Sequence, residues 1–221
     1  MKIIGHRGAR GLAPENTLAS IKKAMQAGVD EVEVDLRVTK DQQIVLAHDP
    51  FIEDATGVKH IIAERSFEEL AKIKPDLAEF SEAVLAIGRK VPLLVEVKPK
   101  VNTIPIIADL EQLLANGWQP KDFLLGSFSQ RTLRALHEAF PDIEPVVIEH
   151  FSGLRAGWRA RAVGAKRINM SKYSLWMPFI KTMKQRGYKL YAYTLNDPKK
   201  ARKWAKGGLA GVITDRPDLF K

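Results

Sequence analysis

The chain contains no cysteine, which excludes a disulfide framework and a thiolate metal site. It also lacks any stretch close to the roughly 18 consecutive apolar residues of a membrane-spanning helix. The first residues, from Met1 to His6, do not form the long apolar core of a signal peptide. Together these absences favour a cytoplasmic protein without stable membrane anchoring.

The length and composition are those of an ordinary globular protein. With 221 residues, 45% of them hydrophobic and 28% charged, the chain is long enough for one well-buried core and short for two. No internal repeat, low-complexity segment or linker interrupts it. We therefore expect a single domain over residues 1–221, and nothing in the sequence fixes an oligomeric state.

The net charge of +9 raises the question of a nucleic-acid partner. The basic residues are spread along the chain, with clusters at 155–167 and 199–206 that have helical spacing. Such spacing is typical of solvated helix faces, and no strip of alternating aromatic and basic residues is present. We expect no nucleic-acid partner, and a positive surface that attracts a small anionic substrate.

Strand-like and helix-like segments alternate along almost the whole chain. The predicted strands are 2–5, 31–38, 43–47, 91–97, 123–127, 145–149, 167–170, 189–194 and 211–214. The predicted helices are 17–27, 66–73, 104–115, 130–140, 177–186 and 198–206. Several strands are apolar throughout, as expected when both faces of a sheet are covered.

Nine strands with intervening helices predict an α/β fold, a (β/α)₈ TIM barrel with an extra hairpin strand after the second strand. The extra strand is 43–47, because the short polar link Thr39-Lys40-Asp41-Gln42 before it is typical of a hairpin turn. A doubly wound open sheet is the alternative. It is disfavoured because the spacing Gly5-x-x-Gly8-x-x-Gly11 does not match a phosphate-binding loop.

Two strands carry ionisable residues at alternate positions. Glu33 and Asp35 point to one side of their strand, and Glu96 and Lys98 to one side of another. The neighbours of the first pair are apolar, so in a barrel the two carboxylates point inward, where they need a cation or strong donors. Carboxylate oxygens without cysteine or clustered histidine favour Mg²⁺ or Ca²⁺ over Zn²⁺.

His6 and His48 each follow an apolar run and so lie at predicted strand ends. In a (β/α)₈ barrel the active site is at the carboxyl ends of the strands, where the acidic residues and Lys98 are also expected. An oxygen-lined cation site edged by a lysine and two imidazoles suits the cleavage of a phosphate ester. The remaining histidines, His60, His137 and His150, lack comparable neighbours and are expected to be ordinary surface or packing residues.

Taken together, these residues and their flanking motifs resemble the glycerophosphodiester phosphodiesterase family. The resemblance is carried, in the family's order, by Gly5-His6-Arg7-Gly8, Pro14-Glu15-Asn16-Thr17, Glu33-Val34-Asp35, Thr39-x-Asp41, His48-Asp49-Pro50, Glu96-Val97-Lys98, Ser127-Phe128, Thr194-x-Asn196 and Thr214-Asp215-Arg216-Pro217-Asp218. These motifs span nearly the whole chain. The N-terminal set is highly specific, and each later motif is weak by itself.

The resemblance implies a (β/α)₈ barrel that uses a divalent metal to hydrolyse glycerophosphodiesters to an alcohol and glycerol 3-phosphate. By position it implies His6 and His48 as general acid and base, in an order that the sequence leaves open. It implies metal ligands and phosphate contacts as well. The ligands are Glu33, Asp35 and Glu96, and the phosphate contacts are Arg7 and Lys98. The nucleophile, water or the 2-hydroxyl of the substrate, is equally open.

Three departures from the family pattern concern the pocket mouth. Tyr193 stands where many members have tryptophan, residues 52–57 lack an arginine and paired threonines, and Phe80-Ser81-Glu82 replaces proline-threonine-leucine. They bear on the substrate rather than on the reaction. A lysophospholipase D-like activity is one alternative, with Phe51, Phe128, Trp176 and Met177 as candidates for an acyl groove. A catalytically silent barrel that serves as a binding module is the other.

Overall fold

Eight parallel strands close into a barrel in the computed structural model, which describes residues 1–220. In order around the ring they are β1 (Lys2–Gly5), β2 (Glu31–Val38), β6 (Leu93–Val97), β7 (Phe123–Ser127), β8 (Glu144–Glu149), β9 (Arg167–Ser171), β10 (Lys189–Tyr193) and β11 (Gly211–Thr214). Strand β1 closes the ring by pairing with β11 on one side and with β2 on the other. The predicted (β/α)₈ barrel is confirmed, and the open sheet is excluded.

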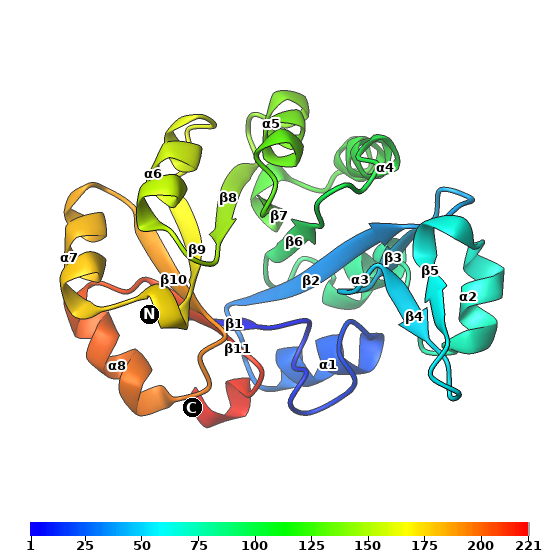
Figure 1. The fold of residues 1–221 in the computed structure, drawn as a ribbon, viewed down its shortest axis with the longest axis horizontal. Helices are drawn as coiled ribbons and strands as arrows, with labels where there is room; N and C mark the ends of the chain where they lie inside the picture. The colour runs from blue at the N-terminus through cyan, green and yellow to red at the C-terminus, as the bar shows by residue number, and fades with distance from the viewer. Residues whose placement is uncertain (221) are drawn as a thin grey trace.

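Eight α-helices cover the outside of the barrel and its flank (Figure 1). They are α1 (Leu18–Gln26), α2 (Phe67–Ile73), α3 (Phe80–Ile87), α4 (Ile104–Ala115), α5 (Gln130–Ala139), α6 (Gly153–Arg161), α7 (Met177–Gln185) and α8 (Pro198–Gly207). Side-chain caps begin several of them: the Thr17, Ser66 and Ser129 hydroxyls each accept a backbone N–H of the first turn. None of the helices in residues 1–220 has the length and apolar character needed to cross a bilayer.

The extra strand is β3 (Ile44–Leu46), which pairs antiparallel with the end of β2. The polar link folds as predicted, with Thr39 N–H donating to the Gln43 carbonyl at 2.9 Å. Strand β1 pairs only with Glu31 and Val32 at the start of β2, whereas β3 pairs with Leu36–Val38 at its end. The chain leaving β1 and the chain leaving β3 therefore both arrive beside the middle of β2, where Gly8 N–H donates to the Glu33 carbonyl and Ala47 N–H to the Asp35 carbonyl.

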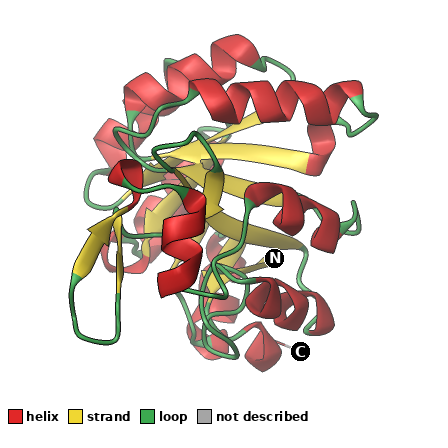
Figure 2. Ribbon diagram, turned by 90° about the vertical axis from the view of Figure 1, so that its right-hand side faces the viewer, coloured by secondary structure: helices red, strands yellow, loops and turns green. Residues whose placement is uncertain are grey.

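Strands β4 (Phe51–Glu53) and β5 (Lys59–Ile61) and helices α3 and α6 were not among the predicted segments, although α6 overlaps the basic cluster at 155–167 that has helical spacing. Strands β4 and β5 form a separate hairpin, which projects from the barrel (Figure 2). Its turn is built by the Asp54 carboxylate, which accepts backbone N–H groups from Thr56 and Val58, a local pattern that short strands do not reveal by periodicity. Helix α3 also lay in a segment for which no helix was expected. It buries Phe80 and Val84 against the barrel.

The interior of the barrel divides into an apolar middle and two charged ends. The inward side chains of the middle are Ile4, Leu94, Leu124, Val146, Ile148, Tyr191 and Ile213. The alternate residues Val32, Val34 and Leu36 of β2 pack outward under the helices. As a result Glu31, Glu33 and Asp35 of the same strand face the interior and are buried.

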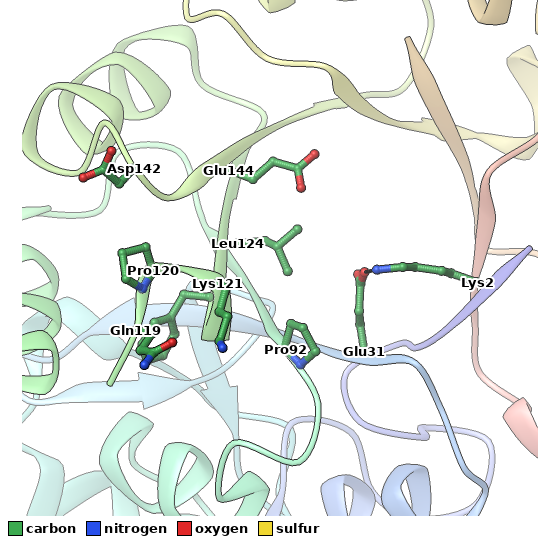
Figure 3. Close-up of a pocket in the computed structure, with 10 residues that line it drawn as sticks. Lys2, Glu31, Pro92, Gln119, Pro120, Lys121, Leu124, Asp142 and Glu144 are labelled. Atoms are coloured by element: carbon green, nitrogen blue, oxygen red, sulfur yellow. Dashed lines mark hydrogen bonds and ion pairs between the residues drawn. The ribbon is translucent and has the colours of Figure 1, made fainter. Parts of the chain in front are cut away.

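The amino-terminal end of the barrel is held by a buried ion pair. Glu31 accepts from Arg167 Nη1 at 2.6 Å and from Lys2 Nζ at 2.7 Å. The guanidinium also stacks on Tyr191, 3.8 Å from the ring centre. Figure 3 shows Lys2 and Glu31 facing each other beside a surface hollow of about 500 Å³ that also takes in Glu144. This hollow lies at the opposite end of the strands from the predicted site residues.

We expect Glu31→Gln to lower the free energy of unfolding by about 3–5 kcal/mol, because it leaves the buried Arg167 without its counter-charge. Equilibrium urea unfolding at pH 7 measures this loss. Glu144→Gln, at an exposed carboxylate on the same end of the barrel, is the matched control and should change stability by less than about 0.5 kcal/mol. Equal stability of the two variants would contradict the argument.

Candidate active site

A cavity of about 230 Å³ opens at the carboxyl ends of the strands. It is lined by all seven predicted site residues: His6, Arg7, Glu33, Asp35, His48, Glu96 and Lys98. The structure thus brings together residues that are up to 92 positions apart in sequence, from His6 to Lys98. Their individual roles stay predictions at this stage.

The turn after β1 folds back over β2 and fixes the first of these residues. Arg7 has a positive φ of 51°, and Gly8 follows with φ 80°. A side chain at Gly8 would lie 2.3 Å from the Ser20 hydroxyl and 2.6 Å from the Ser20 backbone, so only glycine fits here. The Arg7 N–H donates to Glu33 Oε2 at 2.7 Å, and the Gly8 N–H donates to the Glu33 carbonyl at 2.9 Å. The motif therefore holds His6 at the rim of the cavity.

Three carboxylates meet inside the cavity. Glu33 and Asp35 lie two positions apart on β2, and Glu96 lies opposite Asp35 in the register of β2 and β6. One oxygen from each lies within 4.8 Å of the others, and all three residues are buried. Asn16 fixes the middle one, because its amide donates to Asp35 Oδ2 at 2.9 Å and accepts the Asp35 N–H at 3.1 Å.

Burial and mutual repulsion shift these groups in different directions. Burial, then the charge of Asp35, raises the pKa of Glu96 to about 7 and raises the pKa of Glu33 well above its ordinary value. Burial also disfavours the Asp35 anion, but the nearby Lys98 and Arg7 outweigh it and lower the pKa of Asp35 to about 2. If all three carboxylates were ionised, their charge would exceed that of Lys98 and Arg7, so Glu33 and Glu96 hold their protons more tightly than usual.

Lys98 is the internal counter-ion of this cluster. Its ammonium lies 2.5 Å from Asp35 Oδ1 and also donates to Glu96. Burial disfavours its charge, yet the two carboxylates raise its pKa, so it stays protonated. Arg7 contributes from the other side, 2.6 Å from Glu15 and 3.2 Å from Asp35. Both predicted phosphate contacts are thus held in place by carboxylates.

Each of the two predicted catalytic histidines is paired with a carboxylate through Nδ1. His6 Nδ1 lies 2.6 Å from Asp215, which in turn accepts from the Asn196 amide at 2.9 Å. His48 Nδ1 lies 2.9 Å from Asp49, and Arg37 donates to the His48 carbonyl at 2.7 Å. In both residues Nε2 is the ring nitrogen left over for a ligand in the cavity.

The far wall of the cavity contains residues outside the predicted catalytic, metal-binding and phosphate-contact set. These are Phe128, Ile148, His150, Asn169, Tyr193, Thr194 and Ile213. His150, expected to be an ordinary surface or packing residue, is exposed after the end of β8 and also lines the cavity. His60 fits that expectation, since it pairs with Asp54 in the β4–β5 hairpin.

Asn169 has a fixed orientation. Its Oδ1 accepts from Arg167 Nε at 3.1 Å, and its buried Nδ2 has no partner within residues 1–220. Because arginine has only donors, it directs the amide oxygen toward itself. The amide nitrogen is then left to donate to a ligand. Its place two residues after Arg167 on β9 was the available signal, since both share one face of the strand.

The donor set at the carboxylates suits a hard divalent cation. It consists of three buried oxygen ligands without sulfur, and the repulsion that raises the pKa of Glu33 and Glu96 would be relieved by added positive charge. A cavity with such a cluster, two carboxylate-paired imidazoles and two cationic side chains is equipped to bind and cleave a phosphate ester.

Comparison with known proteins agrees with this description. The sequence profile of the Glycerophosphoryl diester phosphodiesterase family matches residues 6–219. The Bacillus subtilis protein named "Putative glycerophosphodiester phosphodiesterase YhdW" is 32% identical over 234 residues, covering 100% of this chain and 96% of that protein. A structure of a phosphodiesterase from Oleispira antarctica, in complex with its product sn-glycerol-3-phosphate, superimposes with a TM-score of 0.87 at 26% identity and covers 100% of this chain and 95% of that one.

Fold and site thus define the class of protein, a (β/α)₈-barrel phosphoric diester hydrolase. The chain belongs to the glycerophosphoryl diester phosphodiesterase family. Half of it, 113 residues at 36% identity, also matches human lysophospholipase D GDPD1, of which it covers 36%.

The raised pKa of Glu96 predicts a pH-dependent stability for the protein in EDTA. The folded protein holds the Glu96 proton up to about pH 7, whereas the unfolded chain releases it near the ordinary value of 4.5. Stability should therefore fall as pH rises from 4.5 to 7, by about 1.4 kcal/mol per pH unit for each proton involved. The raised pKa of Glu33 also makes stability fall as pH rises. The lowered pKa of Asp35 affects stability only below about its ordinary pKa of 3.8.

Urea unfolding at several pH values, with Glu96→Gln as the comparison protein, measures this pH dependence of the free energy of unfolding. The difference in slope between the two proteins reports Glu96 together with the part of the Glu33 pKa shift that the Glu96 charge causes. Added Mg²⁺ or Ca²⁺ should reduce the decline in the unsubstituted protein, because a bound cation favours the charged carboxylates. Identical slopes in EDTA would contradict the prediction.

Proposed function

We propose that this protein is a metal-dependent hydrolase that converts glycerophosphodiesters to an alcohol and glycerol 3-phosphate. The observation that carries the proposal is the convergence of the three-carboxylate cluster and two carboxylate-paired imidazoles in one cavity. The glycerol 3-phosphate bound as product in the structurally similar Oleispira antarctica phosphodiesterase supports the same substrate class.

Glu33, Asp35 and Glu96 would hold the divalent cation, Mg²⁺ or Ca²⁺, since their oxygens are within 4.8 Å of one another. When bound, the cation supplies positive charge that draws electron density from the phosphate. Arg7 and Lys98 add positive charge beside the same phosphate, and the carboxylates that hold them keep both side chains in place.

The environments of the two histidines divide the proton transfers between them. Burial, together with the charge of Lys98, lowers the pKa of His48 below its ordinary 6.5, so His48 is neutral at pH 7 and takes the proton of the attacking hydroxyl. His6 bonds Asp215 through Nδ1, and this carboxylate stabilises the imidazolium that donates from Nε2. The nucleophile oxygen bonds to phosphorus as the P–O bond to the alcohol breaks, and His6 protonates the leaving oxygen. Water as nucleophile gives glycerol 3-phosphate directly, whereas the 2-hydroxyl gives a cyclic phosphate that water then opens.

The opposite wall serves to recognise the rest of the substrate. Asn169 Nδ2 is a buried donor without a hydrogen-bond partner in residues 1–220, and a glycerol hydroxyl is an acceptor that fits it. Tyr193 donates to the Glu149 carbonyl at 3.0 Å and meets Phe128 edge to face at 6.2 Å. These two rings give that wall an apolar surface.

A lysophospholipid is the second candidate substrate, favoured by this aromatic wall and by the match to human lysophospholipase D GDPD1 over half of the chain. Of the four residues considered for an acyl groove, Phe128 lines the cavity. Phe51 lines a neighbouring hollow, Trp176 is exposed, and Met177 packs beside Gly207. Of these four residues only Phe128 thus lines the cavity, and we favour the glycerophosphodiester.

The first test is release of glycerol 3-phosphate from glycerophosphocholine and glycerophosphoethanolamine, with lysophosphatidylcholine assayed in parallel. We expect release that EDTA abolishes and Mg²⁺ or Ca²⁺ restores, with a higher kcat/KM than for the lysolipid. Loss of a residue that only hydrogen-bonds a metal ligand costs roughly 10–100-fold in activity, so Glu33→Ala, which removes a proposed ligand, should lower activity by at least that factor. Glu144→Gln should retain activity. Undiminished glycerol 3-phosphate release in EDTA would refute the metal-dependent mechanism. A higher kcat/KM for lysophosphatidylcholine would make the lysophospholipid the substrate instead.

The lowered pKa of His48 sets the acid limb of the pH profile. Since the base must be neutral, kcat/KM should fall on acidification with a midpoint below pH 6.5. His48→Ala and His6→Ala should each cost about 10²–10⁴ in turnover. His60→Ala is the matched control, because His60 also pairs with an aspartate but lies outside the cavity. Near-native turnover of a folded His6 or His48 variant would remove that residue from the mechanism.

A further inference from the structure

The exposed aromatic side chains of the described residues 1–220 gather in one short stretch. Phe151, Trp158, Tyr173 and Trp176 are each exposed over more than half of their surface, at 77%, 55%, 84% and 59%. Leu154, exposed at 85%, lies among them on the first turn of α6. Exposed groups of this size normally mark an interaction surface. We call Phe151, Leu154, Tyr173 and Trp176 the aromatic rim.

The rim is continuous and borders the cavity. The loops after β8 and β9 are tied by the Ser174 hydroxyl, which donates to the His150 carbonyl at 2.7 Å. Helices α6 and α7 lie side by side (Figure 1), and the Phe179 ring packs against Gly153 so closely that a side chain there would lie 2.4 Å from it. The His150 ring, which lines the cavity, lies 4.4 Å from the Phe151 ring.

The same part of the chain has only one sign of charge. From His150 to Asn196 there are ten lysine and arginine residues and no aspartate or glutamate. Lys172 lies 5.1 Å from the Tyr173 ring, and Lys181 is exposed on α7. Arg155 pairs with Glu149, the last acid before this stretch. Arg159 and Arg167 are likewise paired, with Glu149 and Glu31. The positive charge beside the protruding rings of the rim therefore comes from Lys172 and Lys181.

We propose that the aromatic rim docks this protein reversibly on an anionic lipid surface, with the mouth of the cavity facing the lipid. Tryptophan, tyrosine and phenylalanine side chains prefer the boundary between headgroups and acyl chains, and each lysine near an anionic surface adds attraction. A second copy of the chain is disfavoured, because a symmetric contact would set the positive charges of both copies against each other. This docking is independent of the proposed reaction.

Vesicle co-sedimentation tests the proposal without requiring turnover. We expect the protein to bind vesicles of 30% phosphatidylglycerol in phosphatidylcholine at least 10-fold more strongly than pure phosphatidylcholine, with binding weakened by 0.5 M NaCl. Phe151→Ala combined with Tyr173→Ala should reduce binding at least 10-fold. Lys172→Glu and Lys181→Glu should each reduce it by about 5-fold or more. Tryptophan emission should shift to the blue, since Trp158 and Trp176 lie on this face.

Leu85→Ala combined with Ile104→Ala is the matched control, because these side chains are equally exposed, at 75% and 73%, on helices α3 and α4 away from the rim. It should bind vesicles like the unsubstituted protein. Equal binding to both vesicle types, or full binding by the Phe151/Tyr173 variant, would overturn the proposal. So would rim-dependent dimerisation in light scattering, or rim-dependent binding of a single-stranded oligonucleotide, if vesicles are not bound.

Discussion

The architecture of the site depends on one electrostatic constraint, the burial of Glu33, Asp35 and Glu96 next to one another at the carboxyl end of the barrel. Carboxylates in such surroundings are tolerated only with cations and donors at close range. Lys98 and Arg7 supply charge, and Asn16 supplies both halves of an amide to Asp35. With all three carboxylates ionised, the two cations leave a deficit of positive charge, and that deficit is what a divalent cation would fill.

Strand pairing decides how the histidines reach this cluster. Because β1 pairs only with the start of β2, and β3 takes over at its end, the chain segments after β1 and β3 converge at the same edge. His6 arrives on a turn that Gly8 makes possible, and His48 arrives from the hairpin strand. The amino-terminal end is closed separately by Glu31 and Arg167, and Arg167 in turn orients Asn169 toward the cavity. A structural ion pair and a ligand-facing amide are therefore mechanically linked along β9.

The charges are also organised over a longer range. The net charge of +9 surrounds a cavity whose centre is acidic, so an anionic substrate meets a positive exterior before it reaches the carboxylates. Lys172 and Lys181 add positive charge beside the aromatic rim, which borders the cavity. His150 belongs to both features, because it lines the cavity and contacts Phe151. His150 therefore links the cavity to the aromatic rim.

The sequence by itself determined the barrel, the extra strand and the seven candidate site residues. Alternation along Glu33-Val34-Asp35 and Glu96-Val97-Lys98 is a local property, and the carboxyl ends of parallel strands necessarily share one edge. Only the tertiary structure decided the partners of these residues. The pairing of His6 with Asp215 joins the two ends of the chain. Whether His150 lines the cavity depends on how the end of β8 packs against its neighbours. Helix α3 and the β4–β5 hairpin were missed for the same physical reason: their stability comes from packing and side-chain turns rather than from a repeating pattern in the sequence.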